Sequence, residues 1–241
     1  MPRTGLVAAV AGGATALLFG IVLVKSLRER RSLRSIALEA TCGPRNADRL
    51  ARVLARIDRI NRTDPNRDEG RPKELLYSER MSAMLSDFAG ELVDEELQIA
   101  ARAQHIARWT SPRKAYPEGR AGYLKWRSDL YTFHGSTAKA LMLEEGYDEA
   151  AAERVKYLLS KQGLKGEIRH ANSQLLEDVV CLVFLKYYWK PFSNRDDFDE
   201  EKLIKIVQRT WAKMSNEGHD AALKLQYGDH ELALIQKALG A

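Results

Sequence analysis

The sequence predicts an all-α fold, in which a single compact helical domain follows one N-terminal transmembrane helix. Apolar residues recur at the 3.6-residue spacing of helices through nearly all of residues 46–241, and no segment alternates polar and apolar residues as a half-buried strand does. Residues 5–24 contain no charge, although 29% of the chain is charged. The 241 residues, 45% of them apolar, suffice for one domain with a core of its own.

The N-terminal run is long enough to cross a bilayer once. Twenty residues at a helical rise of 1.5 Å span roughly 30 Å, the thickness of the hydrocarbon layer. Positive charge follows the run, while only Arg3 and the terminal amine precede it, so we expect the rest of the chain on the cytoplasmic side of a membrane. An organelle-targeting segment and a cleaved signal are the alternatives. The basic residues that follow are Lys25, Arg28, Arg30, Arg31 and Arg34.

This reading divides the chain into three parts. Residues 1–30 form the anchor with its basic flank, residues 31–45 form a polar linker, and residues 46–241 form the helical domain.

Caps and breakers place the first helices of the domain. Asn46 can cap a helix that ends before Pro65, and Pro72 opens a second one. A third helix is expected over residues 91–109, where an i, i+4 row of partly apolar positions includes His105.

A Pro- and Gly-containing connector at residues 110–122 precedes the later helices. The run that begins at Ser173 is the most apolar of the domain, so we expect it at the centre. These later helices are expected at residues 123–145, 148–163, 173–189, 199–214 and 229–239.

Basic and aromatic residues are concentrated between residues 102 and 127. This stretch holds seven Arg or Lys, four large aromatic residues, one His and a single acid, Glu118. Such a segment predicts binding of an anionic small molecule or a nucleotide, with arginines on phosphate and aromatic rings available for stacking. The candidate phosphate ligands are Arg102, Arg108, Arg113, Arg120 and Arg127, and the candidate stacking residues are Trp109, Tyr116, Trp126 and the neighbouring Tyr123.

Three polar residues fall in the apolar stripes of different helices: His105, His134 and Asp178. A carboxylate among aliphatic side chains is costly unless a cation, metal or donor meets it. One interpretation is a site for a divalent metal, Mn, Mg or Zn, in which these three are ligands or acid–base groups and Glu177 is a neighbouring carboxylate. The other is that the histidines are hydrogen-bonded core residues and that Asp178 pairs with an arginine such as Arg102 or Arg127.

Five strings resemble, in order and spacing, the family called domain of unknown function 4202. They are IDRINRTDPNRDEGRPKELLYSERM, AARAQHIARWTSPRKAYPEGRAGYLKWRSDL, FHGSTAKALMLEEGYD, LLEDVVCLVFL and TWAKMSNEG. The resemblance covers about residues 48–225 and implies a compact all-helical domain, but no established activity. Some members carry a glutamyl-tRNA synthetase label, and Lys213-Met214-Ser215 resembles the start of a KMSKS loop. Because no strands are predicted to build the parallel sheet of such an enzyme, synthetase activity is not expected.

The segment from His134 onward is also similar to the second half of HD-superfamily domains. The matching features are His134, Gly146, the helix through Val155, and Asp178. The adjacent His-Asp pair of that superfamily is absent, since Gly135 follows His134, so the resemblance implies a metal site that is either altered, with Asp129 as a substitute ligand, or lost.

Two classes of function remain open on this evidence. The first is a metal-dependent phosphohydrolase of degenerate HD type, and the second is a non-catalytic, membrane-tethered module that binds a nucleotide, RNA or a protein partner. The net charge of +5 is too small for a chain-wide nucleic-acid surface, and Cys42 and Cys181 are too few for a disulfide framework. No Gly-rich phosphate loop follows a strand, which argues against a nucleotide-binding α/β domain.

Overall fold

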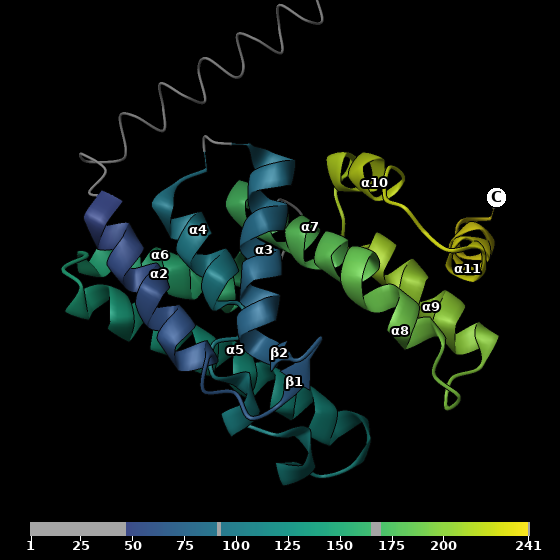
Figure 1. The fold of residues 1–241 in the computed structure, drawn as a ribbon, viewed down its shortest axis with the longest axis horizontal. Coiled ribbons are helices and arrows are strands. Elements are labelled where there is room, and N and C mark those ends of the chain that lie inside the picture. The colour runs from purple at the N-terminus through teal and green to yellow at the C-terminus, as the bar shows by residue number, and fades with distance from the viewer. Residues whose placement is uncertain (1–46, 91–92, 165–169, 241) are drawn as a thin grey trace, which may run out of the picture. The chain divides into compact units, whose positions relative to one another are not determined.

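A computed structural model describes residues 47–90, 93–164 and 170–240 (Figure 1). Within these ranges the chain forms ten α-helices, short 3-10 turns and one two-stranded antiparallel hairpin, which confirms the predicted all-α class. Residues Asn46–Ala241 make up one compact unit. No helix in the described ranges combines the length and apolarity needed to cross a bilayer, and the predicted span and linker at residues 5–24 and 31–45 lie outside the described residues.

The N-terminal half contains four helices and the hairpin. The helix expected after Asn46 runs to Asn61, and the helix expected at Pro72 begins at Lys73. The helix expected at residues 123–145 begins four residues earlier, at Gly119. The elements are α2 (Ala47–Asn61), β1 (Arg67–Asp68), β2 (Arg71–Pro72), α3 (Lys73–Ala89), α4 (Glu95–Ala103), the 3-10 turns η1 (Arg108–Thr110) and η2 (Arg113–Ala115), and α5 (Gly119–Glu144).

The C-terminal half contains six helices. α10 was not expected from the sequence, while α6, α7, α9 and α11 lie where caps and apolar spacing placed them. The elements are α6 (Glu149–Leu159), the 3-10 turn η3 (Gln162–Leu164), α7 (Ala171–Val183), the π-helical turn η4 (Phe184–Tyr188), α8 (Trp189–Ser193), α9 (Glu200–Trp211), α10 (Asn216–Ala222) and α11 (Asp229–Leu239).

The core centres on α7, as its apolar sequence predicted. Leu176, Val179, Leu182 and Val183 are each at most 1% exposed. α3 crosses α7 in the middle of the domain, α2, α4 and α6 lie on one side of this crossing, and α9 to α11 lie on the other (Figure 1). α7 therefore joins the two halves of the domain through its apolar side chains.

The start of α3 is fixed by an acidic side chain from the preceding turn. Asp64, only 1% exposed, accepts a hydrogen bond at Oδ2 from the backbone nitrogen of Glu74 (3.0 Å) and at Oδ1 from the backbone nitrogen of Asn66 (2.9 Å). Backbone donors in a first helical turn lack intrahelical partners, so this contact acts as a cap. It holds Glu74 at the inner end of the helix.

Candidate functional site

A small polar cavity lies where six segments of the domain meet. Its volume is about 130 Å³, and its walls come from the turn after α4, from η1, α5 and α7, and from the chain after α6 and α9. Many of the predicted site residues line it, although they are spread over more than seventy positions of the sequence. These are His105, Arg108, Trp126, Arg127, His134 and Glu177, together with Tyr123.

His105 reaches the cavity from a turn and not from a helix face. The third helix was expected over residues 91–109, but α4 ends at Ala103 and the chain turns at Ala107, whose φ is 51°. Asn61 Oδ1 accepts a hydrogen bond from the Ala107 nitrogen (3.1 Å), and His134 Nδ1 lies 2.6 Å from the carbonyl oxygen of Gln104. The prediction failed because these partners from α2 and α5 satisfy backbone groups that would otherwise continue the helix.

A left-handed φ at alanine is uncommon and carries strain that the surroundings must offset. At Ala107 the backbone bend directs both His105 and Arg108 to the cavity. The strained turn therefore positions two of the polar groups that line the site.

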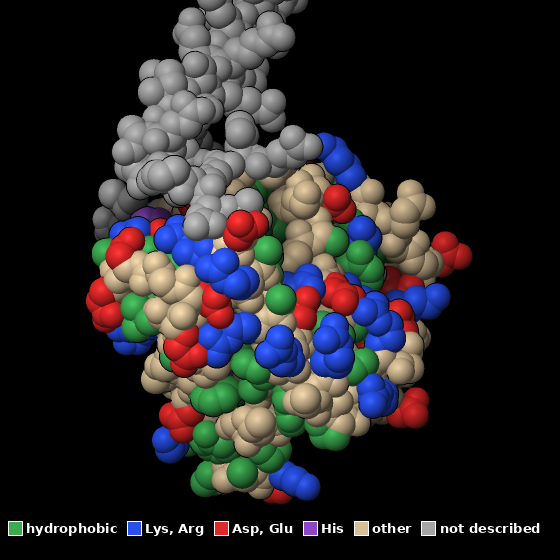
Figure 2. All heavy atoms as spheres, turned by 60° about the vertical axis from the view of Figure 1, so that its left-hand side comes forward, with side chains coloured by type: hydrophobic (Ala, Val, Ile, Leu, Met, Phe, Trp, Pro, Cys, Tyr) green, Lys and Arg blue, Asp and Glu red, His purple; other side chains and the backbone are tan. Residues whose placement is uncertain are grey.

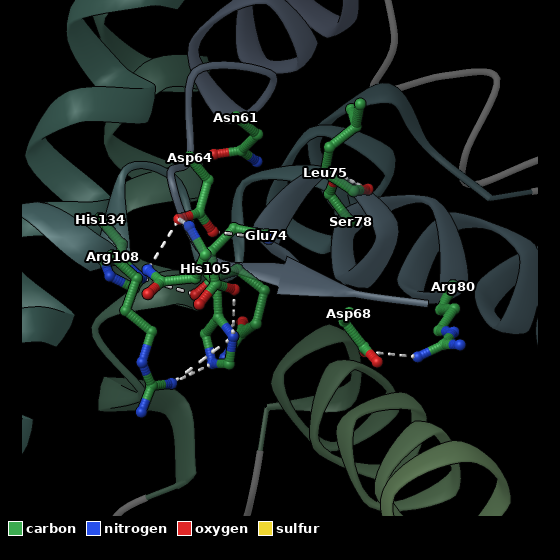
Figure 3. Close-up of polar contacts among 12 residues, drawn as sticks. Asn61, Asp64, Asp68, Glu74, Leu75, Ser78, Arg80, His105, Arg108 and His134 are labelled. Atoms are coloured by element: carbon green, nitrogen blue, oxygen red, sulfur yellow. Dashed lines mark hydrogen bonds and ion pairs between the residues drawn. The ribbon is translucent and has the colours of Figure 1, made fainter. Parts of the chain in front are cut away.

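The imidazole of His105 is held between an acid and a base (Figure 3). Glu74 Oε2 lies 3.1 Å from Nδ1, and Arg108 Nη1 lies 2.6 Å from Nε2. A guanidinium group can only donate, so Nε2 must accept and Nδ1 must donate to Glu74. His105 is thus neutral, and burial together with the nearby Arg108 holds its pKa well below the usual value. The ring of Tyr77 stacks on it at a centroid distance of 4.0 Å.

Glu74 is the acid that sequence reasoning missed. It lies in the first turn of α3, where an exposed acid is ordinary, and nothing in its local pattern indicates a contact with His105. Burial raises the pKa of Glu74 to about 7, although Arg108 and Lys73 oppose the shift. Its carboxyl group is therefore poised to titrate near neutral pH.

His134 combines a structural contact with an unused nitrogen. The side chain is 3% exposed, and its Nδ1 donates to the Gln104 carbonyl at the end of α4. Nε2 has no hydrogen-bond partner among the described residues. Burial, with His105 and Arg108 nearby, keeps the pKa of His134 well below its usual value, so Nε2 is an acceptor.

Two arginines of the cavity make no ion pair with a carboxylate in the described ranges. Arg108 contacts His105 and lies 5.0 Å from the centre of the Trp126 ring. Arg127 donates to the hydroxyl of Tyr131 and lies 5.7 Å from the ring centre of Tyr123. Both guanidinium groups are half-buried, and their interactions with carboxylates, of Arg108 with Glu74 and of Arg127 with Glu177, act through space and not through a direct ion pair.

Two lysines, not predicted as site residues, meet the acid of the cavity. Glu177 is 5% exposed; Lys161 Nζ donates to its Oε2, and Lys213 Nζ lies 3.8 Å from its Oε1. Burial alone would raise the pKa of Glu177, but Lys161, Lys213 and Arg127 hold it below its usual value. Lys161 follows α6 with a φ of 57°, a left-handed conformation that is unusual for lysine. The local sequence gives no sign of this conformation.

Asp178 does not join the histidines, which corrects the prediction of a shared metal site. Its Oδ1 accepts hydrogen bonds from the Ser215 nitrogen (2.8 Å) and from Gln174 (3.0 Å), and its Oδ2 accepts from the Ser215 hydroxyl (2.7 Å). It is a support for the N-terminus of α10, and the neighbouring Glu177 faces the cavity instead. In the described part of the chain, no three His, Cys, Asp or Glu side chains converge to hold a metal ion.

The three other predicted phosphate ligands lie outside the cavity. Arg102 Nε and Nη2 donate to both carboxylate oxygens of Asp58 (2.6 and 2.7 Å), which also excludes the proposed pair with Asp178. Arg113 donates to the carbonyl oxygen of Tyr116 (3.0 Å), and Arg120 is exposed. The concentration of basic and aromatic residues identified the segment, but it did not show which of these side chains point into the cavity.

Of the remaining predicted residues, one lines the cavity and the others lie elsewhere. Trp126 donates from Nε1 to the Ser111 carbonyl (2.8 Å) and lines the cavity, whereas Trp109 packs against the core and Tyr116 lies in the connector. Asp129, the suggested substitute metal ligand, forms a surface ion pair with Lys125 (2.9 Å).

Among known proteins, the chain matches one family. No curated protein and no solved structure matches the chain. The family described as "Domain of unknown function (DUF4202)" matches residues 51–235, which is well over half of the chain and includes every residue of the cavity. The chain therefore belongs to the domain of unknown function 4202 family.

Proposed function

We propose that this domain binds a phosphate-bearing anionic ligand, with the phosphate group in the cavity between Arg108 and Arg127. The single observation that carries the proposal is that both guanidinium groups line the cavity without a carboxylate partner in the described ranges. Guanidinium groups match the geometry of phosphate oxygens and form short charge-assisted hydrogen bonds with them.

The local charge balance supports the same conclusion. Glu177 is bound by Lys161 and approached by Lys213, and the described residues that line the cavity carry four cations against this one carboxylate, so the lining has a net positive charge. The face formed by α2, α4 and α6 differs, because acidic and basic side chains alternate there (Figure 2). Pairs such as Arg154–Glu96 (2.7 Å) neutralise that face. Positive potential is thus concentrated where low-dielectric walls strengthen it.

His134 adds selectivity for the state of the ligand. Its buried Nε2 is a hydrogen-bond acceptor without a partner in the described ranges, so a bound ligand with a donor group could satisfy it. A phosphate group that retains a proton supplies such a donor next to the two arginines, since its second pKa is about 6.

Binding of inorganic phosphate tests the proposal. We expect phosphate to raise the melting temperature of the full chain, and to have little effect on Arg108→Ala and Arg127→Ala, because a ligand stabilises only a fold that binds it. Arg120→Ala is the matched control, since this arginine lies on the same basic segment but outside the cavity. Equal phosphate-induced shifts in all four proteins, or no shift in the wild type, would contradict the proposal.

Hydrolysis of a phosphate ester is the second candidate function, and the Glu74–His105 hydrogen bond favours it. A neutral imidazole oriented by a carboxylate is suited to act as a general base. If Arg108 moved from Nε2 to the phosphate, Nε2 would accept a proton from a water molecule whose oxygen attacks phosphorus. The bond from phosphorus to the leaving oxygen would break, and solvent would protonate that oxygen.

No step of this reaction runs through a divalent metal, because the predicted ligands do not fit one: Asp178 is occupied by Ser215 and Gln174. We expect phosphatase activity on p-nitrophenyl phosphate to be lost in His105→Ala while phosphate binding persists. Absence of turnover in a wild-type protein that binds phosphate would leave the domain as a non-catalytic binding module.

The membrane assignment is a separate part of the proposal. We propose that residues 5–24 anchor the protein in a membrane once, with the helical domain on the cytoplasmic side. The support is the uncharged run and the positive charge that follows it.

A further inference from the structure

A larger groove opens beside the cavity and shares part of its wall. The groove has a volume of about 810 Å³ and lies between α5 and the segment formed by α6 and η3. Arg127, Tyr131 and Lys161 line both spaces. The cavity alone, at about 130 Å³, is smaller than the 300 to 1,000 Å³ typical of small-molecule sites, whereas the groove falls within that range. A ligand that filled both would place a compact group in the cavity and its larger part in the groove.

The groove is lined by both polar and apolar side chains. Hydroxyl and amide groups from both walls are available for hydrogen bonds, and none of the described residues that line the groove is acidic. The exposed apolar side chains of the lining are Leu124 on α5 and Tyr157 on α6, with 51% and 38% of their surfaces exposed. The hydroxyl and amide groups belong to Ser128, Thr132, Ser160 and Gln162.

We propose that the ligand is a nucleoside monophosphate, an inference that rests on the phosphate-binding function proposed above. The phosphate occupies the cavity at Arg108 and Arg127, the sugar lies at the junction with the groove, and the base lies against Tyr157. A planar base suits Tyr157 because aromatic side chains stack on the π-face of any base, while the hydroxyl groups of the groove can bind the polar edges of a base and a sugar.

The distribution of charge favours a mononucleotide over a polymer. The cations that line the groove are Arg127 and Lys161 at the cavity and Lys156 farther along. Beyond Lys156, the adjoining hollow is lined by Glu153, whose carboxylate lies 3.5 Å from Lys156 Nζ, and by Arg154, which is already paired with Glu96. A second phosphate would meet the acid Glu153 there and no unpaired arginine, whereas strands of nucleic acid require a positive groove that continues along the backbone.

A ligand series on the full chain tests the inference by isothermal titration calorimetry. The probes are inorganic phosphate, ribose 5-phosphate and the four common ribonucleoside 5′-monophosphates. We expect at least one monophosphate to bind at least about tenfold more tightly than inorganic phosphate, with ribose 5-phosphate between them. Tyr157→Ala should weaken the tightest monophosphate at least about fivefold, since base stacking contributes about 1 kcal/mol or more, and should leave inorganic phosphate unaffected.

Tyr116→Ala is the matched control, because Tyr116 is a half-buried tyrosine that lines neither space. Its affinities should equal those of the wild type. Tyr157 is exposed enough that its replacement should leave the melting temperature nearly unchanged, which separates loss of binding from loss of folding.

Each contrary result has a distinct meaning. If phosphate binds but no monophosphate binds more tightly, or if Tyr157→Ala retains the full gain, the groove assignment is wrong and the phosphate site stands. If inorganic phosphate itself does not bind, the proposed function fails. If a 5′-phosphorylated decanucleotide binds more than tenfold more tightly than its best mononucleotide, the ligand is a nucleic acid strand and the inference is overturned.

Discussion

Glu74 Oε2 and His105 Nδ1 lie 3.1 Å apart, although 31 positions separate the two residues in the sequence. The contact joins the first turn of α3 to the strained turn after α4, and Arg108 covers the opposite nitrogen of the same ring. An acid, an imidazole and a guanidinium group therefore form one hydrogen-bonded row at the edge of the cavity. Within this row, protonation of Glu74 is coupled to the stability of the fold.

Stability should fall with rising pH because of Glu74, whose pKa is raised from 4.5 to about 7 by burial. Below about pH 4.5 both the folded and the unfolded states hold the proton. Between pH 4.5 and 7 the unfolded state releases it and the folded state retains it, so the unfolded state binds fewer protons and stability decreases. The full loss, complete above pH 7, is on the order of 3 kcal/mol at 1.36 kcal/mol per unit.

Glu74→Gln should remove this pH dependence. Urea unfolding at pH 4.5 and at pH 8 should show the stability difference between variant and wild type shifting by about 3 kcal/mol in favour of the variant. Glu79→Gln, which alters a surface acid of the same helix paired with Arg71, is the matched control, and its stability difference should shift by less than about 1 kcal/mol because exposed ion pairs contribute little. A shift for Glu74→Gln no larger than that of the control would mean that Glu74 does not retain its proton in the folded protein through this range.

Replacement of Asp178 should affect folding and not binding. Asp178→Ala removes the acceptor for the Ser215 nitrogen and hydroxyl, and we expect a loss of about 2 to 4 kcal/mol in the free energy of unfolding. Phosphate affinity should be unchanged in the folded variant because Asp178 does not line the cavity. Asp220→Ala, an exposed acid in α10, should change the free energy of unfolding by less than about 0.5 kcal/mol. Loss of phosphate binding in a stably folded Asp178→Ala would restore the shared-site interpretation.

The pair formed by Arg102 and Asp58 should contribute to stability as a unit. A double-mutant cycle with Arg102→Ala and Asp58→Ala should give a coupling energy of about 1 to 3 kcal/mol, because both groups are largely buried and bonded through two oxygens. The exposed pair of Arg195 and Asp197 has the same two-bond geometry and should couple far more weakly, since solvent screens it. Equal coupling in the two cycles would show that burial is not the cause.

Divalent metal binding should be substoichiometric. We expect elemental analysis of the full chain, after incubation with Mn, Mg or Zn and gel filtration, to give much less than one ion per chain. The reason is that Asp178 is engaged away from the histidines and no third ligand converges with them in the described ranges. A stoichiometric ion that is lost in His105→Ala and His134→Ala would contradict this expectation and favour the metal-dependent phosphohydrolase.

Residues 5–24 should determine how the protein partitions. The full chain should sediment with membranes and resist extraction by alkaline carbonate, because transfer of the uncharged run into hydrocarbon is favourable. A variant that lacks residues 1–45 retains the whole compact unit Asn46–Ala241 and should remain in the supernatant. Cofractionation of the shortened variant with membranes would locate the membrane-binding determinant in the helical domain.

Local signals predicted much of the helical fold because they act within one turn. The helices expected at residues 148–163 and 199–214 open on the cap residues Asp148 and Asp199, and each of these accepts a hydrogen bond from the backbone nitrogen three residues later. The same reasoning overextended the third helix, where no breaker separates Ala103 from His105. That helix ends because Asn61 and His134, distant in sequence, bind its backbone.

The sequence by itself determined the all-α class, most helix positions, the apolar centre at α7 and the basic segment that supplies Arg108 and Arg127. Tertiary structure decided which polar groups meet: Glu74 reaches His105, and Glu177 faces the cavity in place of Asp178. Helical periodicity fixes the face on which a side chain lies, but the packing of that face against its neighbours selects the partner. Neighbouring residues on a helix point about 100° apart, so the orientation of α7 about its own axis decides which of the two adjacent carboxylates faces the cavity.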